Sequence, residues 1–139
     1  MRDKLFGYCM ELSIEALNIE PIDLVVTGSE EFPVASSSGN YFPETRTLYI
    51  NESFYHSASF ETLAYFAAHQ ARRVFQIDAT NNPELFSNVV SKETIALWAE
   101  ELKNYVNPND DNDDEYYAQA IEKDADDFAH TFIALNPKV

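Results

Sequence analysis

The sequence is poor in the residues that crosslink chains, bind phosphate or cross membranes. Its single cysteine, Cys9, lies on the apolar side of a helical pattern, which predicts a buried thiol, no intrachain disulfide and a reducing, cytoplasmic location. Three widely separated glycines cannot build a glycine-rich phosphate loop. No apolar run approaches the roughly 20 residues of a transmembrane helix, and the N-terminal segment lacks a secretory apolar core. We therefore expect no membrane contact.

Basic residues are also scarce. The chain of 139 residues has 9 Lys plus Arg against 24 Asp plus Glu, which gives a formal net charge of −15. Direct nucleic-acid binding needs a basic surface, so this balance argues against it and favours a basic protein partner or one that itself binds nucleic acid. The 45% of hydrophobic and 14% of aromatic residues predict a packed core in one domain spanning residues 1–139.

The first half of the chain contains one helical pattern followed by strand patterns. The helical spacing of apolar residues predicts a helix over residues 3–18, and the β-branched run Asp23–Thr27 predicts a strand. The alternating run Arg46–Asn51 predicts a further strand. Between these two, Val34–Ser38 is a candidate strand that Gly39-Asn40 would end in a turn.

Three helices are predicted in the second half. Ser59 is a suitable N-cap for a central helix that ends near Gln76, and Ser91 is one for a helix that ends at Asn107-Pro108. The last helix is predicted from about residue 115 to residue 135. This order of elements predicts an α+β fold, in which a small antiparallel sheet of two or three strands packs against about four helices. The apolar stripe of the central helix consists of Phe60, Leu63, Ala67, Ala71 and Val74.

Two helical segments place polar side chains beside an apolar stripe. On the central helix, His69 and Arg73 lie one turn apart on one face, with Gln76 about one turn further along. On the last helix, Glu122 shares a face with the stripe residue Ala125, so its carboxylate is expected to point inward or along a cleft. The first segment reads His69-Gln70-Ala71-Arg72-Arg73-Val74-Phe75-Gln76, and the second reads Glu122-Lys123-Asp124-Ala125-Asp126-Asp127-Phe128-Ala129.

Over roughly residues 40–133 the chain resembles the small zincin metallopeptidases. In that family a His-Glu-x-x-His helix supplies two zinc ligands and the general base, and a glutamine follows at the position of Gln76. A later helix, often of the pattern Glu-x-Asp-Ala-x-x-Phe-Ala, supplies an acidic third ligand. Residues 122–129 match this second pattern throughout. The resemblance implies one zincin-like domain.

The chain departs from the zincin pattern at the catalytic positions. Gln70 replaces the general base and cannot accept a proton from a metal-bound water, and Arg73 replaces the second histidine and cannot ligate a metal. With His69 and Glu122 left, we expect a degenerate site without zinc and without catalytic residues. We predict that Arg73 places its guanidinium near the vacated metal position and pairs with Glu122. The alternative is that both are surface residues.

Acidic residues concentrate between residues 107 and 127, where nine acids accompany one lysine. The run Asp110–Glu115 resembles the start of a calcium loop, but it lacks the glycine and the distal glutamate that such a loop needs. The segment is either a solvated surface or a face that binds a basic partner. The candidate residues of that face are Asp110, Asp111, Asp113, Asp114, Glu115, Asp124 and Asp127.

Three functions remain open. The first is a catalytically inactive metallopeptidase-like domain that acts as a protein-binding module. The second is an acidic inhibitor or nucleic-acid mimic that occupies a nucleic-acid channel, as small phage antagonists of host defence do. The third is an atypical zinc-dependent peptidase, with His69, Glu122 and either Asp126 or His130 as ligands.

Overall fold

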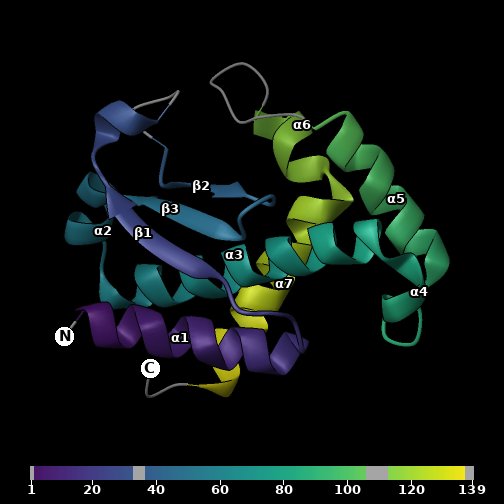
Figure 1. The fold of residues 1–139 in the computed structure, drawn as a ribbon, viewed down its shortest axis with the longest axis horizontal. Helices are drawn as coiled ribbons and strands as arrows, with labels where there is room; N and C mark the ends of the chain where they lie inside the picture. Colours follow the sequence, from purple (N-terminus) through teal and green to yellow (C-terminus); the bar gives the residue numbers. More distant parts are fainter. Residues whose placement is uncertain (1, 33–36, 106–112, 137–139) are drawn as a thin grey trace.

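The computed structural model describes residues 2–32, 37–105 and 113–136, which form one sheet and the helices around it (Figure 1). The predicted α+β class is confirmed. The elements in chain order are α1 (Arg2–Leu17), β1 (Asp23–Thr27), the 3-10 helix η1 (Ser29–Glu31), β2 (Gly39–Phe42), β3 (Thr47–Asn51), α2 (Glu52–Ser57), α3 (Phe60–Asn81), α4 (Pro83–Phe86), α5 (Lys92–Lys103), α6 (Asp113–Ala118) and α7 (Ala120–Leu135).

Strand β3 is the centre of a three-stranded mixed sheet with the order β1-β3-β2. β1 runs parallel to β3, with Leu24 opposite Leu48, and β2 runs antiparallel to it, with Tyr41 also opposite Leu48. The predicted antiparallel sheet is therefore wrong for β1. The chain that leaves β1 first forms β2 on the far side of β3, and the turn after β2 sends β3 back in the direction of β1. Both β1 and β2 are edge strands.

The turn between β2 and β3 lies after Phe42, where the Arg46 N–H donates to the Pro43 carbonyl (3.3 Å). The predicted turn at Gly39-Asn40 is wrong, since these residues begin β2. Gly39 has a packing role there, because a Cβ would lie 2.9 Å from the ring of Phe66. Residues 34–36 of the predicted strand Val34–Ser38 lie outside the described residues.

Arg46 ties the sheet to α3. Its φ of 50° lies in the left-handed region. Its guanidinium contacts both carboxylate oxygens of Asp78 in α3 (2.8 and 3.2 Å) and donates to the carbonyls of Glu20 and Pro21 before β1 (2.9 and 3.2 Å). This contact falls in the part of α3 beyond Gln76, where the sequence predicted that the helix would already have ended.

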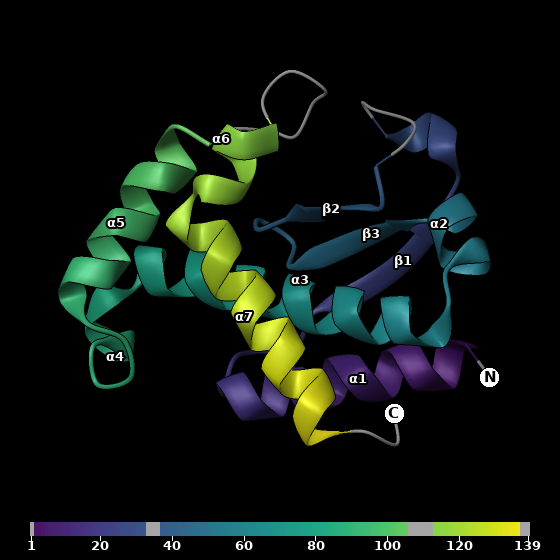
Figure 2. The same cartoon turned by 180° about the vertical axis from the view of Figure 1, so that it is seen from behind.

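Helix α3 lies between the sheet and α1, and α7 crosses it (Figures 1 and 2). The predicted N-cap is confirmed, because the Ser59 hydroxyl accepts from the Thr62 N–H (3.1 Å). Phe60 is not part of the buried stripe: it is 45% exposed, and the guanidinium of Arg2 packs over its ring (5.3 Å). The other stripe residues, Leu63, Ala67, Ala71 and Val74, are buried as predicted.

Helix α1 closes the core from the other side of α3. It corresponds to the helix predicted over residues 3–18, and its inner face includes Phe6, Cys9 and Met10. Burial raises the pKa of the Cys9 thiol to about 11, so the predicted buried thiol is confirmed. No helix among the described residues is both long and apolar enough to cross a membrane.

The predicted last helix over residues 115–135 is interrupted and forms α6 and α7. Gln119 has an extended conformation (φ −61°, ψ 134°) and is the N-cap residue of α7. The carboxylate of Glu101 on α5 accepts from the N–H groups of Ala120 and Ile121 (2.8 Å each). This contact from α5 satisfies the first amides of α7 and explains the break, which the apolar periodicity does not reveal.

Candidate functional site

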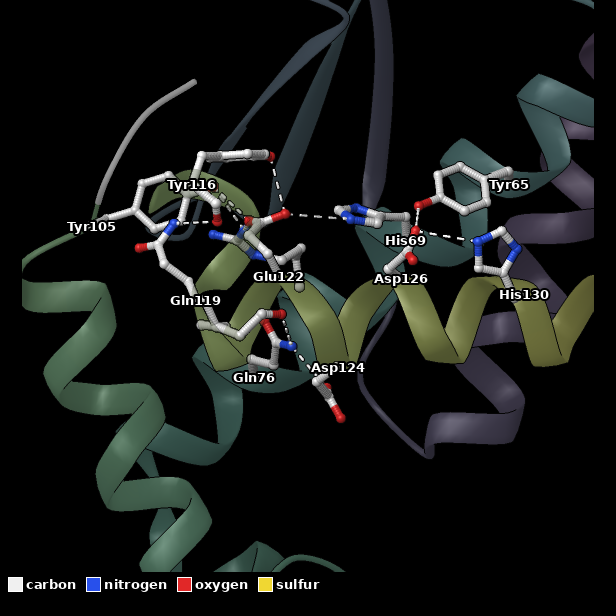
Figure 3. A network of polar contacts seen from close by, with 12 residues as sticks. Tyr65, His69, Gln76, Tyr105, Tyr116, Gln119, Glu122, Asp124, Asp126 and His130 are labelled. Atoms are coloured by element: carbon white, nitrogen blue, oxygen red, sulfur yellow. Dashed lines mark hydrogen bonds and ion pairs between the residues drawn. The ribbon is translucent and has the colours of Figure 1, made fainter. Parts of the chain in front are cut away.

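The crossing of α3 and α7 brings together the polar residues that the sequence singled out (Figure 3). Small side chains, among them Ala71 of α3 and Ala125 and Ala129 of α7, are fully buried at the centre of the core. The close approach that small residues allow places longer polar side chains beside one another. The centre of the resulting cluster is Glu122, which is only 4% exposed.

Both carboxylate oxygens of Glu122 face several polar groups. Oε1 accepts hydrogen bonds from the Arg73 guanidinium and from the Tyr105 hydroxyl (2.5 Å). Oε2 accepts from the Tyr116 hydroxyl (3.0 Å) and lies 3.6 Å from Nε2 of His69. The predicted pairing of Arg73 with Glu122 is therefore confirmed, and the alternative that both are surface residues is wrong.

The cluster holds its negative charge on Glu122. Burial alone would raise the pKa of this carboxyl, but the contacts with His69 and Tyr105 and the charge of Arg73 outweigh burial and hold the pKa at about 2. Burial raises the pKa of both Tyr105 and Tyr116, and the neighbouring Glu122 carboxylate adds to each shift. At neutral pH the cluster thus combines a carboxylate and a guanidinium with two neutral phenols.

Arg73 is enclosed on several sides. Besides its bond to Glu122, its Nη1 donates to the Tyr105 hydroxyl (3.1 Å), and its guanidinium carbon lies 4.8 Å from the centre of the Tyr105 ring. Its Nε is buried without a hydrogen-bond partner among the described residues. The side chain is therefore fixed by one carboxylate and one aromatic ring, and it fills the space beside Glu122.

A second polar contact lies at the same helix crossing. Arg72 forms a bidentate salt bridge with Asp124, in which Nε and Nη2 donate to the two carboxylate oxygens (2.7 and 3.0 Å). The guanidinium carbon of Arg72 lies 4.4 Å from the centre of the Phe75 ring. The buried amide of Gln76 donates to Asp124 (2.8 Å) and to the Ile121 carbonyl (2.9 Å). Asp124 is therefore paired within the molecule, although 27% of its side chain remains exposed.

A third contact lies further along α7. The hydroxyl of Tyr65 donates to Asp126, and Nε2 of His130 lies 3.4 Å from the same carboxylate. Asp126 is thus held by partners other than His69 and Glu122, the metal ligands with which the sequence grouped it. No group of three or more metal-ligating residues occurs among residues 2–32, 37–105 and 113–136.

The residues present do not fit a zincin-type zinc ion. Such a site needs three protein ligands and one open position. The position that the resemblance assigns to a second histidine holds Arg73, whose guanidinium bonds to Glu122, and four polar groups face the two carboxylate oxygens of Glu122. Gln70, at the position of the general base, is partly exposed.

The predicted acidic face is described only in part. Asp110 and Asp111 lie outside the described residues, and the structure describes the backbone of Asp113 and Asp114 in α6 without their side chains. Glu115 and Asp127 are exposed. In the described part of the chain, two acids of this face are thus exposed, while Asp124 is partly exposed and paired with Arg72.

Several residues of the cluster were not identified from the sequence as site residues. No sequence pattern identified Tyr116, because it lies in α6, and its contact with Glu122 of α7 depends on how the two helices are arranged. Tyr105 follows the C-terminal end of α5, and its side chain is partly buried against the core. Tyr65 lies one turn before His69 on α3, so helical spacing alone was sufficient to group the two.

The fold and the cluster define an α+β protein with a buried, ion-paired carboxylate at the crossing of two helices. No family model matches the chain, and neither the curated proteins nor the solved structures include a match.

Proposed function

We propose that this chain is a zincin-like, metallopeptidase-like protein without peptidase activity, which acts in the cytoplasm by binding another protein. The proposal combines the zincin-like patterns of residues 69–76 and 122–129 with the contacts of Glu122. The single observation that carries it is the bond between Arg73 and Glu122. This bond joins the position of the second zinc ligand to the third ligand itself.

The geometry opposes metal-dependent hydrolysis for two reasons. The lone pairs of Glu122 are directed at the Arg73 guanidinium and at two tyrosine hydroxyls, so a cation would have to displace these groups. The side chain of Gln70 cannot take a proton from an attacking water, so the reaction also lacks its base. A zincin-like fold that has lost this chemistry retains its surfaces, and binding is the function that surfaces support.

The net charge favours a basic partner. With a charge of −15, association with a basic protein is accelerated and association with an acidic one is opposed. The same charge supports a second candidate function, an acidic inhibitor that occupies the nucleic-acid site of its target. The two differ in the degree of salt dependence: the affinity of a nucleic-acid mimic falls steeply as salt rises, whereas for a binder with an apolar contact area salt mainly slows association.

The substitution Arg73→His tests the zincin-like geometry directly. It restores the second histidine of the zincin pattern and removes the cation from Glu122, so we expect the variant to bind zinc with His69, His at position 73 and Glu122 as ligands. Wild-type protein is expected to hold no stoichiometric zinc after dialysis. The measurement is metal content by mass spectrometry, together with the rise in Tm on addition of zinc, because binding to the folded state stabilises it.

Arg72→His is the matched control. It places the same residue one position away, at the helix crossing but beside Asp124, and it should gain no zinc site. Stoichiometric zinc in the wild-type protein, or zinc-dependent cleavage of a casein substrate by it, would show that the chain is a working metallopeptidase. Equal zinc binding by the two histidine variants would show that residue 73 does not occupy a zincin ligand position.

A further inference from the structure

Strand β1 is an open edge of the sheet. Within the part of the chain that the structure describes, it pairs only with β3, on the opposite side of β3 from β2 (Figure 1). The Asp23 N–H donates to the Arg46 carbonyl (2.9 Å), and in a parallel pair the next bonds to β3 fall two and four residues later, at Val25 and Thr27. The peptide groups of Leu24 and Val26 therefore point away from the sheet. Among the described residues, none outside the sheet forms a backbone hydrogen bond with these groups.

The three central side chains of this strand are apolar and exposed. Leu24, Val25 and Val26 are 36%, 39% and 42% exposed, although they alternate between the two faces of the sheet. Unpaired strands are normally protected by lysine, proline, a bulge or a covering element. The sequence Asp-Leu-Val-Val-Thr contains neither lysine nor proline, and only its first residue is charged. The strand is thus suited to pairing with a further strand.

The opposite edge lacks these properties. Strand β2 has four residues, begins with Gly39 and Asn40, and is followed by Pro43. Glycine weakens strand pairing, and proline cannot donate to a neighbouring strand. Of its side chains only Phe42 is a large hydrophobic residue with high exposure, at 44%. The free edge of β1 is therefore the better template for an added strand.

The charges near β1 identify the kind of strand it suits. Glu20 and Asp23 lie at its start, Glu30 and Glu31 follow its end, and all four are exposed. The nearby Arg46 is bonded to Asp78 and to backbone carbonyls, so it does not offset them. A second copy of this chain would bring the same acids and a net charge of −15 to the contact, which opposes self-pairing.

We propose that an extended segment of a basic partner protein adds to β1 as a fourth strand. The segment has apolar side chains next to Leu24, Val25 and Val26, and lysine or arginine on either side of them. Main-chain bonds to Leu24 and Val26 provide the pairing, while the flanking acids select for basic residues. This inference rests on the proposed protein-binding function, but it does not depend on whether Glu122 can bind a metal.

A displayed library of random peptides, selected on the intact wild-type protein, tests the proposal. We expect the selected peptides to contain a short run of apolar residues with strand propensity and to carry lysine or arginine near both ends. In hydrogen exchange followed by NMR, the strongest of these synthetic peptides should protect the amides of Leu24 and Val26 at least tenfold. Acidic peptides, peptides with helical spacing, no selected peptides, or no protection of these two amides would overturn the proposal.

Two variants locate the binding edge. Val26→Lys places a lysine on the proposed edge and should weaken peptide binding at least tenfold. A lysine on an edge strand disfavours pairing with a further strand, and its charge repels the basic residues of the peptide. Phe42→Lys adds the same charge at a similarly exposed position on β2 and should change binding less than twofold. Equal losses in both variants would overturn the proposal, and circular dichroism checks that both are folded.

Two further measurements distinguish a basic partner strand from a second copy of the chain and from a peptidase substrate. Sedimentation of the protein without peptide should show a monomer. A dimer that protects the same amides would identify a second copy as the occupant and overturn the choice of a basic partner. Mass spectrometry of the bound peptide should show it intact. Cleavage would contradict the proposed inactivity while leaving the binding edge as inferred.

Discussion

Glu122 stays ionised in a position where water reaches little of it. Its side chain is 4% exposed, and the pKa of its carboxyl is nevertheless held at about 2 by the groups that face it. An unpaired charge at such a depth would be strongly destabilising. Arg73, Tyr105, Tyr116 and His69 are therefore needed as a set, because each supplies part of the solvation that the carboxylate has lost.

Replacing this carboxylate should lower stability in a pH-dependent way. The folded pKa of about 2 lies below the ordinary value of 4.5, so the unfolded chain takes up the proton first as the pH falls. The contribution of Glu122 is fully present above about pH 4.5 and is lost between about pH 4.5 and pH 2. We expect Glu122→Gln to lower the free energy of unfolding by about 3 kcal/mol at pH 6 and by much less near pH 2.5.

Urea denaturation of the wild-type and variant proteins at the two pH values measures this difference. The exposed Glu115 of α6 provides the control, since Glu115→Gln removes an acid close to the same helices without touching the cluster. A loss of stability that is the same at both pH values would contradict the assignment of the low pKa to Glu122.

The sequence predicted the centre of the cluster better than its periphery. Helical spacing and the zincin-like pattern were sufficient to pair Arg73 with Glu122, because both residues lie on inward faces of regular helices. Asp124 was a candidate for the acidic face that binds a partner, since nothing in its local pattern shows that Arg72 approaches it from another helix. Tyr116 contacts the Glu122 carboxylate from α6, because the helix is interrupted at Gln119 before α7 begins.

At the scale of the elements, α7 depends on α5 for its beginning. The Glu101 carboxylate accepts two backbone N–H groups at the N-terminus of α7, where a negative charge is also favoured by the helix dipole. The N-cap residue Gln119 makes no side-chain capping bond of its own. The start of the helix that carries Glu122 is therefore fixed from outside the helix.

We expect Glu101→Gln to lower the free energy of unfolding by about 1 kcal/mol, because an amide can accept only one of the two bonds and carries no charge. Urea denaturation measures the loss, and hydrogen exchange should show faster exchange of the Ala120 and Ile121 amides. Glu100→Gln is the control, because Glu100 is exposed and bonds to Asn104, the C-cap residue of α5. Unchanged exchange at both amides would refute the capping role.

Element boundaries were predictable where the chain itself supplies the cap. Ser59 and Ser91 start their helices as predicted, each through a bond between its own hydroxyl and a nearby N–H. The direction of β1 was not predictable from its residues, because a parallel and an antiparallel edge strand of this composition look alike in sequence. That direction is decided by the path of the chain through β2.

For the whole molecule, the net charge of −15 opposes folding into a compact shape. The ion pairs at the helix crossing are partly or largely buried, so dissolved salt screens them less than it screens repulsion between exposed acids. Moderate salt should therefore weaken the repulsion between exposed acids more than it weakens the buried ion pairs.

We expect the Tm to rise by several degrees between 10 and 200 mM NaCl, measured by circular dichroism at pH 7. Sodium fluoride should give a similar rise if screening is the cause, because both salts have the same ionic strength. A fall in Tm over this range would mean that exposed ion pairs contribute more to stability than the excess of acids costs.

The turn at Arg46 constrains which residues can replace it. Glycine or asparagine would suit the left-handed backbone, but neither reaches Asp78 and the carbonyls of Glu20 and Pro21. Lysine would retain the charge without the planar fork that contacts several acceptors at once. Distant relatives that keep this junction between sheet and helix should therefore retain arginine at a position where turn statistics favour glycine, and that residue is a useful anchor for aligning them.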